Sequence, residues 1–295
     1  MTAPIAHCQR DTGVLRISGE DRLNFLHRLL TADVATLGRG TSRQCLLLDT
    51  KGRVQALMKM TATGDAIVSF ANKRAIETVV TTLQRYVLGA DVAFEVSEAA
   101  VVGLRGPKLD DLISRTELPD DSVVACDGDL AQIACPAPEA VRDGLVAAGA
   151  AEVDGEAWRV ARVMACEPAH DAEITGAEFP QELGLVDAVD FEKGCYLGQE
   201  TVARIHYRGQ VNRLLATVRA DHRLDVGGDL LDGDSPVGRI SSAAGMSSGG
   251  SIALALLSRA AAAPGAVLVD ETGGQVEVVA NVETRSGTTN GPSDP

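Results

Sequence analysis

Residues 192–209 read EKGCYLGQETVARIHYRG, and this stretch carries most of what the sequence says about the protein. It places Cys195 between two glycines, Gly194 and Gly198, and two residues after Lys193. Glycine permits tight turns and the close approach of a ligand or of a second backbone segment. A core strand would not contain so many glycines and charges, and a solvated helix has no need of a central Cys-Tyr pair. The stretch is therefore a candidate functional loop.

Cys195 is the best candidate for a reactive sulfur in this chain. A helix is expected to begin near Leu197, which places Cys195 just ahead of a helix N-terminus. The helix start, Lys193, Arg204 and Arg208 would each stabilise a thiolate. Free cysteines usually behave as small buried hydrophobic residues. From the residues alone, a reactive thiol and a buried structural cysteine are both open interpretations.

The polar residues that follow also have two readings. Gln199 and Glu200 are either ordinary polar residues at a helix start or hydrogen-bond partners that fix the loop or face a heteroaromatic ligand. Tyr196 suits an amphipathic position in a core. Arg204 and Arg208 form either a solvated face or a seat for the carboxylate tail of a ligand.

Two other chemistries are weakly supported around this cysteine. A cysteine hydrolase needs a histidine base within hydrogen-bond reach, and no local nucleophile signature accompanies Cys195. A metal site needs several donors, whereas only Cys195 and His206 occur near each other. The sequence therefore predicts no metal site.

Length and composition set the class of the protein. A chain of 295 residues suggests two or three domains, and 45% hydrophobic with 23% charged residues is typical of a globular protein. The net charge of −14 argues against binding to nucleic acid or to an anionic membrane, since an acidic surface repels phosphate. A small anionic ligand held by a local basic cluster stays compatible with this charge.

The cysteines and the apolar segments predict a cytoplasmic protein. The six cysteines contain no C-x-x-C pair, which favours reduced thiols. The first residues lack the apolar core of a signal peptide, and no apolar run reaches the ~20 residues that span a bilayer.

Local patterns predict an α+β protein followed by an all-β region. QCLLLDTKGRVQALMKM, residues 44–60, reads as a hairpin around Asp49-Thr50-Lys51-Gly52, and Asn72 is a natural cap for the helix after it. Strands and helices then alternate up to about residue 150. Beyond residue 210, short strands separated by Gly, Ser and Asp turns predict a small barrel or sandwich.

The signature loop also carries a family resemblance. KGCYLGQE, residues 193–200, resembles the K-G-C-Y-x-G-Q-E signature of the YgfZ-type folate-binding proteins. That family includes relatives that act in iron–sulfur cluster assembly, and it shares its fold with the T-protein (aminomethyltransferase) of glycine cleavage. The segments ISGEDRLNFLHRLLTADVATLGRG, LRGP, FPQELGL and SPVGRISSA resemble further family elements along most of the chain.

The resemblance implies a three-domain T-protein-like fold of the α+β class. We expect a split folate-binding domain at residues 1–50 plus 151–210, an inserted α+β domain at 51–150, and a small C-terminal β-barrel at 211–284. Residues 285–295 are polar and without periodicity, and are expected to form a disordered tail.

The resemblance also implies a set of site residues. Glu182 lies in FPQELGL, where the T-protein has a glutamate that contacts the pterin; a carboxylate can accept two parallel N–H bonds from an aminopyrimidine edge. Arg204 or Arg208 would meet the glutamate carboxylate of the folate. Cys195, activated by Lys193 and the helix start, would supply a redox-active or transiently ligating thiolate. The rest of the signature loop consists of Gly194, Tyr196, Gly198, Gln199 and Glu200.

These residues predict a tetrahydrofolate-binding accessory protein that supports the assembly or repair of iron–sulfur clusters in client enzymes. A lone cysteine cannot hold a cluster, so a client or assembly protein is expected as partner. The first alternative is an enzyme, a folate-dependent aminomethyl- or methyltransferase. T-proteins carry an essential aspartate where this chain reads ANKRAIETVV, in which Glu77 is the only acid, so a non-enzymatic role is favoured. The second alternative is a folate-binding scaffold or sensor without thiol chemistry.

Overall fold

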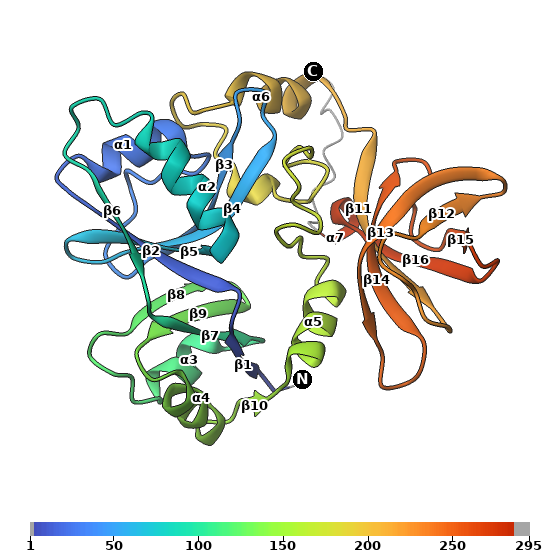
Figure 1. The fold of residues 1–295 in the computed structure, drawn as a ribbon, viewed down its shortest axis with the longest axis horizontal. Helices are drawn as coiled ribbons and strands as arrows, with labels where there is room; N and C mark the ends of the chain where they lie inside the picture. Colours follow the sequence, from blue (N-terminus) through green and yellow to red (C-terminus); the bar gives the residue numbers. More distant parts are fainter. Residues whose placement is uncertain (1–2, 286–295) are drawn as a thin grey trace, which may run out of the picture. The chain divides into compact units, whose positions relative to one another are not determined.

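A computed structural model describes residues 3–285 and divides the chain into two compact units. The first unit contains the chain up to Trp158 together with Asp187–Thr201, and the second contains Arg159–Val186 and the chain from Val202 onward. Figure 1 shows the elements of both units. Most of the predicted disordered tail, residues 286–295, lies outside the described residues.

The first unit contains a five-stranded sheet in the order β3-β4-β5-β2-β6. Its strands are β2 (Thr12–Ser18), β3 (Ser42–Leu48), β4 (Val54–Ala62), β5 (Ala66–Asn72) and β6 (Ala93–Ser97). Helices α1 (Arg22–Leu29) and α2 (Lys73–Gln84) bury apolar faces in the same core as this sheet. Phe25 of α1 and Val79 of α2 lie in that core together with Met58 of β4. As predicted, Asn72 caps α2, because its side chain accepts the Arg74 backbone N–H at 2.9 Å.

A second five-stranded sheet of this unit has the order β10-β1-β7-β9-β8. Its strands are β1 (Ile5–Gln9), β7 (Ala100–Arg105), β8 (Val123–Asp127), β9 (Leu130–Cys135) and the two-residue β10 (Ala151–Glu152). Helices α3 (Leu109–Ser114) and α4 (Pro138–Ala147) contribute Leu112 and Leu145 to the core on one face. Only β10 pairs in parallel, with β1.

The strand pairing divides the chain differently from the predicted domain boundaries. A boundary at residues 50/51 cuts the β3–β4 hairpin, in which Leu46 pairs with Leu57. A boundary at 150/151 places β10 apart from the sheet that it extends, since Ile5 pairs with Ala151. The hairpin itself is correctly predicted by the apolar runs around Asp49–Gly52. In addition, β1 leaves the sheet of β2 and pairs with Val101–Arg105 of β7, about 95 residues later in the chain.

The second unit contains a closed β-barrel, which confirms the predicted C-terminal barrel. Its order is β11-β14-β13-β12-β15-β16, formed by β11 (Arg213–Ala220), β12 (Asp229–Asp232), β13 (Ser235–Gly245), β14 (Ser251–Ser258), β15 (Val267–Asp270) and β16 (Gln275–Asn281). The helix α7 (Val282–Arg285) follows the last strand. The strand β14 reads SIALALLS and is almost wholly buried. Side chains of a barrel strand alternate between the interior and the exterior, so both faces of β14 are covered.

The chain passes between the two units within α5 (Gly155–Met164), near the short 3-10 helix η1 (Val186–Ala188), and within α6 (Gln199–Arg208). Within the described range, no helix is both long and apolar enough to cross a bilayer.

A hydrogen-bonded pair, His222 and Asp270, stabilises the turn between β15 and β16 of the barrel. His222 Nε2 lies 2.7 Å from Asp270 Oδ2, and Asp270 Oδ1 accepts the backbone N–H groups of Thr272 and Gly274 at 2.9 Å each. These hydrogen bonds hold the pKa of Asp270 at about 2 despite the opposing effect of burial. The bonds to Asp270 and Asp221 raise the pKa of His222 above its usual value.

We therefore predict that the barrel loses stability as pH rises from 6 to 9. A histidine whose pKa is raised by folding stabilises the native state below its unfolded pKa, and this contribution is lost as pH rises through the folded pKa. His222→Gln removes the effect. The difference in unfolding temperature between the natural protein and the variant should be about 2 °C larger at pH 6 than at pH 9. Parallel melting curves across this range would contradict the prediction.

Candidate functional site

Cys195 lies on an irregular loop between η1 and α6. All six cysteines are free thiols, and Cys195 is the exposed one among them. Cys45, Cys135 and Cys166 are buried, and burial raises the pKa of Cys45 to about 12. Cys126 is half-buried, and burial raises its pKa to about 11. Exposure therefore singles out Cys195 as the thiol that a partner can reach.

Lys193 anchors this loop to the end of α1. Its ammonium donates hydrogen bonds to the carbonyl oxygens of His27, of Leu30 at 2.6 Å and of Ala32 at 3.0 Å. The last carbonyls of a helix have no partner within the helix, and a cation is favoured at that end by the helix dipole. The three ammonium protons are thus all directed to backbone carbonyls. The same ammonium lies 5.4 Å from the centroid of the Tyr196 ring.

A buried threonine strengthens the same attachment. Thr31, which follows α1, donates its hydroxyl to the Ala188 carbonyl at 2.6 Å and accepts the Leu46 N–H at 2.8 Å. Its own carbonyl accepts the Asp190 N–H at 2.9 Å. Thr31 therefore joins α1, β3 and the segment that leads into the Cys195 loop. No sequence pattern marked it, because its partners lie 15 and 157 residues away.

These contacts give Lys193 a structural task that the sequence did not predict. Burial lowers its pKa to about 8, against the opposing charges of Asp33 and Asp190, so the ammonium form still prevails at pH 7. The three hydrogen bonds of its ammonium group all go to carbonyls at the end of α1. Activation of the Cys195 thiol by Lys193 therefore stays a prediction, and the contacts support a positioning role for this residue.

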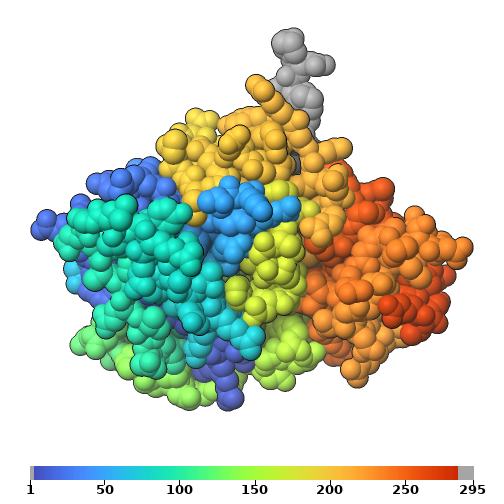
Figure 2. All heavy atoms as spheres, turned by 45° about the horizontal axis from the view of Figure 1, so that its top comes forward, coloured from blue at the N-terminus to red at the C-terminus, as the bar shows by residue number. Residues whose placement is uncertain are grey.

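Gly198 fixes the other end of the loop. It adopts a φ of +79°, and a Cβ at this position would overlap the Asp49 carbonyl oxygen and lie 2.9 Å from the Gly52 Cα. The loop thus packs directly on the tip of the β3–β4 hairpin. Figure 2 shows the two segments side by side, with the hairpin in light blue and the chain around Gly198 in yellow to gold. The left-handed residue also explains why α6 begins at Gln199, two residues later than predicted.

The remaining signature residues differ in what they contact. Tyr196 is buried, with 6% of its surface exposed, and so belongs to the core. Gln199 and Glu200 form the first turn of α6, and Glu200 is exposed. A Cβ at Gly194 would meet no described atom within 4 Å, so within this chain Gly194 is not required by close packing. Its small size leaves open space beside Cys195.

Glu182 lies in the second unit and is held by an arginine. Its carboxylate is 94% buried and receives Arg213 Nε at 3.0 Å, Arg213 Nη2 at 3.3 Å and the Phe179 backbone N–H at 2.9 Å. This two-pronged pairing is typical of strong arginine–carboxylate contacts. Arg213 is the first residue of β11 and belongs to no local motif, so the sequence did not predict this pairing. Contact of Glu182 with a pterin stays a prediction.

The predicted carboxylate-binding arginines lie on α6 in the same unit as Glu182. Arg204 and Arg208 are both exposed, and within the described residues neither has a hydrogen bond or ion pair. Gln181, beside Glu182, donates its side-chain amide to the Val202 carbonyl of α6 at 3.0 Å. The Glu182 loop and the helix that carries the two arginines are therefore neighbours.

A second buried acid in this unit was also missed. The Glu173 carboxylate accepts hydrogen bonds from Arg162 at 3.1 Å, Ser242 at 2.6 Å and the Ala169 N–H at 2.8 Å. It joins the C-terminal half of α5 to strand β13 of the barrel. Among the described residues, no group of three or more His, Cys, Asp and Glu side chains is arranged to hold a metal ion.

We predict that Lys193→Met loosens the Cys195 loop. The substitution keeps a long side chain but leaves three carbonyls without their cation, so the free energy of unfolding should fall by about 1–3 kcal/mol. Amide exchange in residues 190–198 should accelerate. Lys73→Met, which changes an exposed lysine, should leave both measurements near those of the natural protein. Unchanged exchange in the loop of Lys193→Met would refute the anchoring role.

Comparison with known proteins gives relatives and a fold. No family model matches the chain. A protein of Vibrio atlanticus named tRNA-modifying protein YgfZ is 27% identical over 236 residues, covering 73% of each chain. A protein of Aliivibrio fischeri with the same name is 27% identical over 209 residues, which cover 68% of this chain and 66% of that protein. A putative chloroplastic transferase of Arabidopsis thaliana is 23% identical over 280 residues, covering 86% of this chain and 65% of its own.

A solved structure extends the likeness to the fold. The glycine cleavage system aminomethyltransferase T of Bartonella henselae matches with a TM-score of 0.81 and 19% identity, covering 95% of this chain and 86% of that one. The predicted T-protein-like architecture is thereby confirmed. The chain is thus similar in sequence to the YgfZ proteins and has the fold of the glycine cleavage T-protein.

Proposed function

We propose that this protein is a tetrahydrofolate-binding accessory factor that supports the assembly or repair of iron–sulfur clusters in client enzymes. The observation that carries the proposal is Cys195, an exposed thiol on a loop held at Lys193 by the end of α1 and at Gly198 by the β3–β4 hairpin. A thiol held in this way keeps a defined position at the surface, where a partner can contact it. Iron–sulfur clusters need several thiolates, so a cluster would be cargo shared with a client or an assembly protein.

The residues of the second unit fit the two ends of a folate. The buried Glu182 carboxylate is an acceptor of the kind that an aminopyrimidine edge requires, and Arg213 balances its charge. The exposed guanidinium groups of Arg204 and Arg208 suit the glutamate carboxylate at the other end. Within this proposal, Glu182 orients the pterin and the α6 arginines hold the tail. Bound tetrahydrofolate would supply a one-carbon carrier or a reductant.

A folate-dependent transferase is the second candidate. The names of the relatives support it, since they refer to tRNA modification and to a transferase. The site after β5 argues against aminomethyl transfer of the T-protein kind. Asn72 occupies the end of that strand and is committed to capping α2, while Glu77 is exposed on the outer face of the helix. The acid that the transfer requires thus has no evident replacement there.

Folate binding gives the first test. Isothermal titration with tetrahydrofolate should show saturable binding, and Glu182→Gln should weaken it about 10-fold or more, because a charged acceptor becomes a neutral amide. Asp234→Asn removes an exposed acid of the same unit and should bind as the natural protein does. Equal affinity of the Glu182→Gln and natural proteins would exclude Glu182 from the pterin site.

The role of the thiol gives the second test. In cells that lack the protein, Cys195→Ala should fail to restore the activity of iron–sulfur enzymes, although its affinity for tetrahydrofolate is unchanged. Cys126→Ala, at a half-buried thiol, is the matched control and should restore it. Full rescue by Cys195→Ala would favour a folate-binding scaffold or sensor. Turnover of an aminomethyl donor with added folate would favour the transferase.

A further inference from the structure

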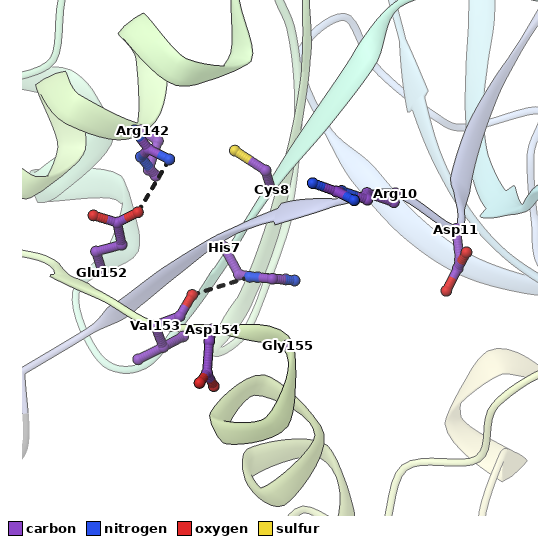
Figure 3. Close-up of a pocket in the computed structure, with 9 residues that line it drawn as sticks. All are labelled: His7, Cys8, Arg10, Asp11, Arg142, Glu152, Val153, Asp154 and Gly155. Carbon is purple, nitrogen blue, oxygen red and sulfur yellow. Dashed lines mark hydrogen bonds and ion pairs between the residues drawn. The ribbon is translucent and has the colours of Figure 1, made fainter.

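A cavity of about 500 Å³ lies in the first unit at the edge of the β10-β1-β7-β9-β8 sheet. None of its residues belongs to the loop of Cys195 or to the segment of Glu182. Figure 3 shows the residues that line it: His7, Cys8, Arg10, Asp11, Arg142, Glu152, Val153, Asp154 and Gly155. A volume of this size accommodates a small organic ligand or a few peptide residues.

The cavity lies where β10 stops pairing with β1. The backbone N–H groups of Ala151 and Val153 donate to the carbonyls of Pro4 and Ala6, at 2.8 and 3.1 Å. In a strand, the N–H and C=O of alternate residues point to the same side. The Cys8 backbone therefore points to the side of β10, but β10 ends at Glu152 and the chain turns away into α5. Within the described residues, this part of the β1 edge has no strand beside it.

His7 forms a rigid wall of the cavity. Its Nδ1 lies 3.0 Å from the Val153 carbonyl oxygen, so Nδ1 carries the proton and donates. The imidazole stacks on Trp158 with ring centroids 5.7 Å apart. This arrangement leaves Nε2 as the acceptor on the cavity side, 3.8 Å from where a Cβ of Gly155 would lie. In Figure 3 the ring extends from β1 toward the space below Arg10.

The charges around the cavity are laid out along β1. Arg142 is neutralised, because it pairs with Asp143 at 2.7 Å and with Glu152 at 3.0 Å. Arg10, one residue beyond the end of β1, is exposed and has no ion pair among the described residues. Its guanidinium reaches back along β1 toward Cys8 in Figure 3.

Acidic side chains lie at the start of the open edge. Glu152 ends β10, and Asp154 follows it and caps α5 by accepting the Ala157 N–H at 2.8 Å. Asp11 also lines the cavity, but its carboxylate points away from Arg10 in Figure 3. The open edge therefore runs from an acidic end to a cationic end in the direction of β1.

The thiol in this cavity is not arranged for reaction. Cys8 is half-buried and its Sγ lies 3.9 Å from the Pro138 carbonyl oxygen. Burial raises the pKa of this thiol, so it stays protonated at neutral pH. A binding role is thus favoured over thiol chemistry.

We propose that the cavity binds the carboxy-terminal end of a short peptide, which lies parallel to β1 in continuation of β10 and pairs with the Cys8 backbone. The terminal carboxylate meets Arg10, and the amino end faces Glu152 and Asp154. Addition of an extended peptide to an open sheet edge is an established mode of recognition, in which backbone hydrogen bonds supply affinity. When a residue of the parallel peptide lies opposite Cys8, the backbone N–H of the next peptide residue donates to the Cys8 carbonyl.

Triglycine tests the proposal, because it offers a backbone and two charged ends without side chains. Isothermal titration of the full-length protein should show saturable binding, weakened about 10-fold or more by Arg10→Ala. Arg85→Ala removes an exposed arginine of the same unit outside the cavity and should not change the affinity. Triglycine amide lacks the carboxylate. Its affinity for the natural protein should be as low as the affinity of triglycine for the Arg10→Ala variant.

Methylated peptides separate backbone pairing from simple charge attraction. Val153 already occupies the position opposite His7, so the first peptide residue lies opposite Cys8 and the second donates its N–H to the Cys8 carbonyl. Gly-Sar-Gly lacks this N–H, whereas Gly-Gly-Sar keeps it. Gly-Sar-Gly should therefore bind several-fold more weakly than Gly-Gly-Sar. N-acetyl-triglycine lacks the charged amino end and should bind more weakly, because that end faces Glu152 and Asp154; undiminished binding would contradict this placement. No binding of triglycine, or binding insensitive to Arg10→Ala, would overturn the proposal.

Discussion

The arrangement of the Cys195 loop depends on one ammonium group at the end of one helix. Helix α1 ends with carbonyls that no residue of the helix can satisfy, and Lys193 supplies the missing donors from 166 residues further along the chain. Thr31 fastens the preceding segment to the same place. A single point of the first unit therefore determines where the loop begins, and Gly198 on the β3–β4 hairpin determines where it ends. Cys195 is exposed between two fixed points, which suits a thiol that must be found by a partner.

The second unit solves a related problem with buried acids. The segment between α5 and η1 has almost no regular structure, so its backbone must be held by side chains. Glu173 binds Arg162 and Ser242, and Glu182 binds Arg213 and the Phe179 N–H. Buried carboxylates are tolerated only when they are paired and hydrogen-bonded, as these are. The same Glu182 is the proposed pterin contact, so structural support and recognition fall on one residue.

Sequence reasoning succeeded where the signal was local. The β3–β4 hairpin, the Asn72 cap and the strands of the barrel follow from turn residues and from the spacing of apolar residues within a few positions. It failed where contacts join distant segments. The pairing of β1 with β7, and not with its neighbour β2, has no local signal. Arg213, Thr31 and Glu173 were missed because an isolated polar residue carries no pattern until its partner is known.

The sequence by itself determined the class of fold, the C-terminal barrel and the identity of the signature loop, because these depend on residue types at short spacing. Only the tertiary structure decided what the signature residues contact. It placed the Lys193 ammonium on the carbonyls at the end of α1, where it anchors the Cys195 loop, and it paired Glu182 with Arg213. It also showed that β10 pairs with only the first part of β1, which leaves the edge near Arg10 without a neighbouring strand among the described residues. The physical reason is that unpaired backbone groups and buried charges are satisfied by whichever side chains the fold brings near, irrespective of their distance along the chain.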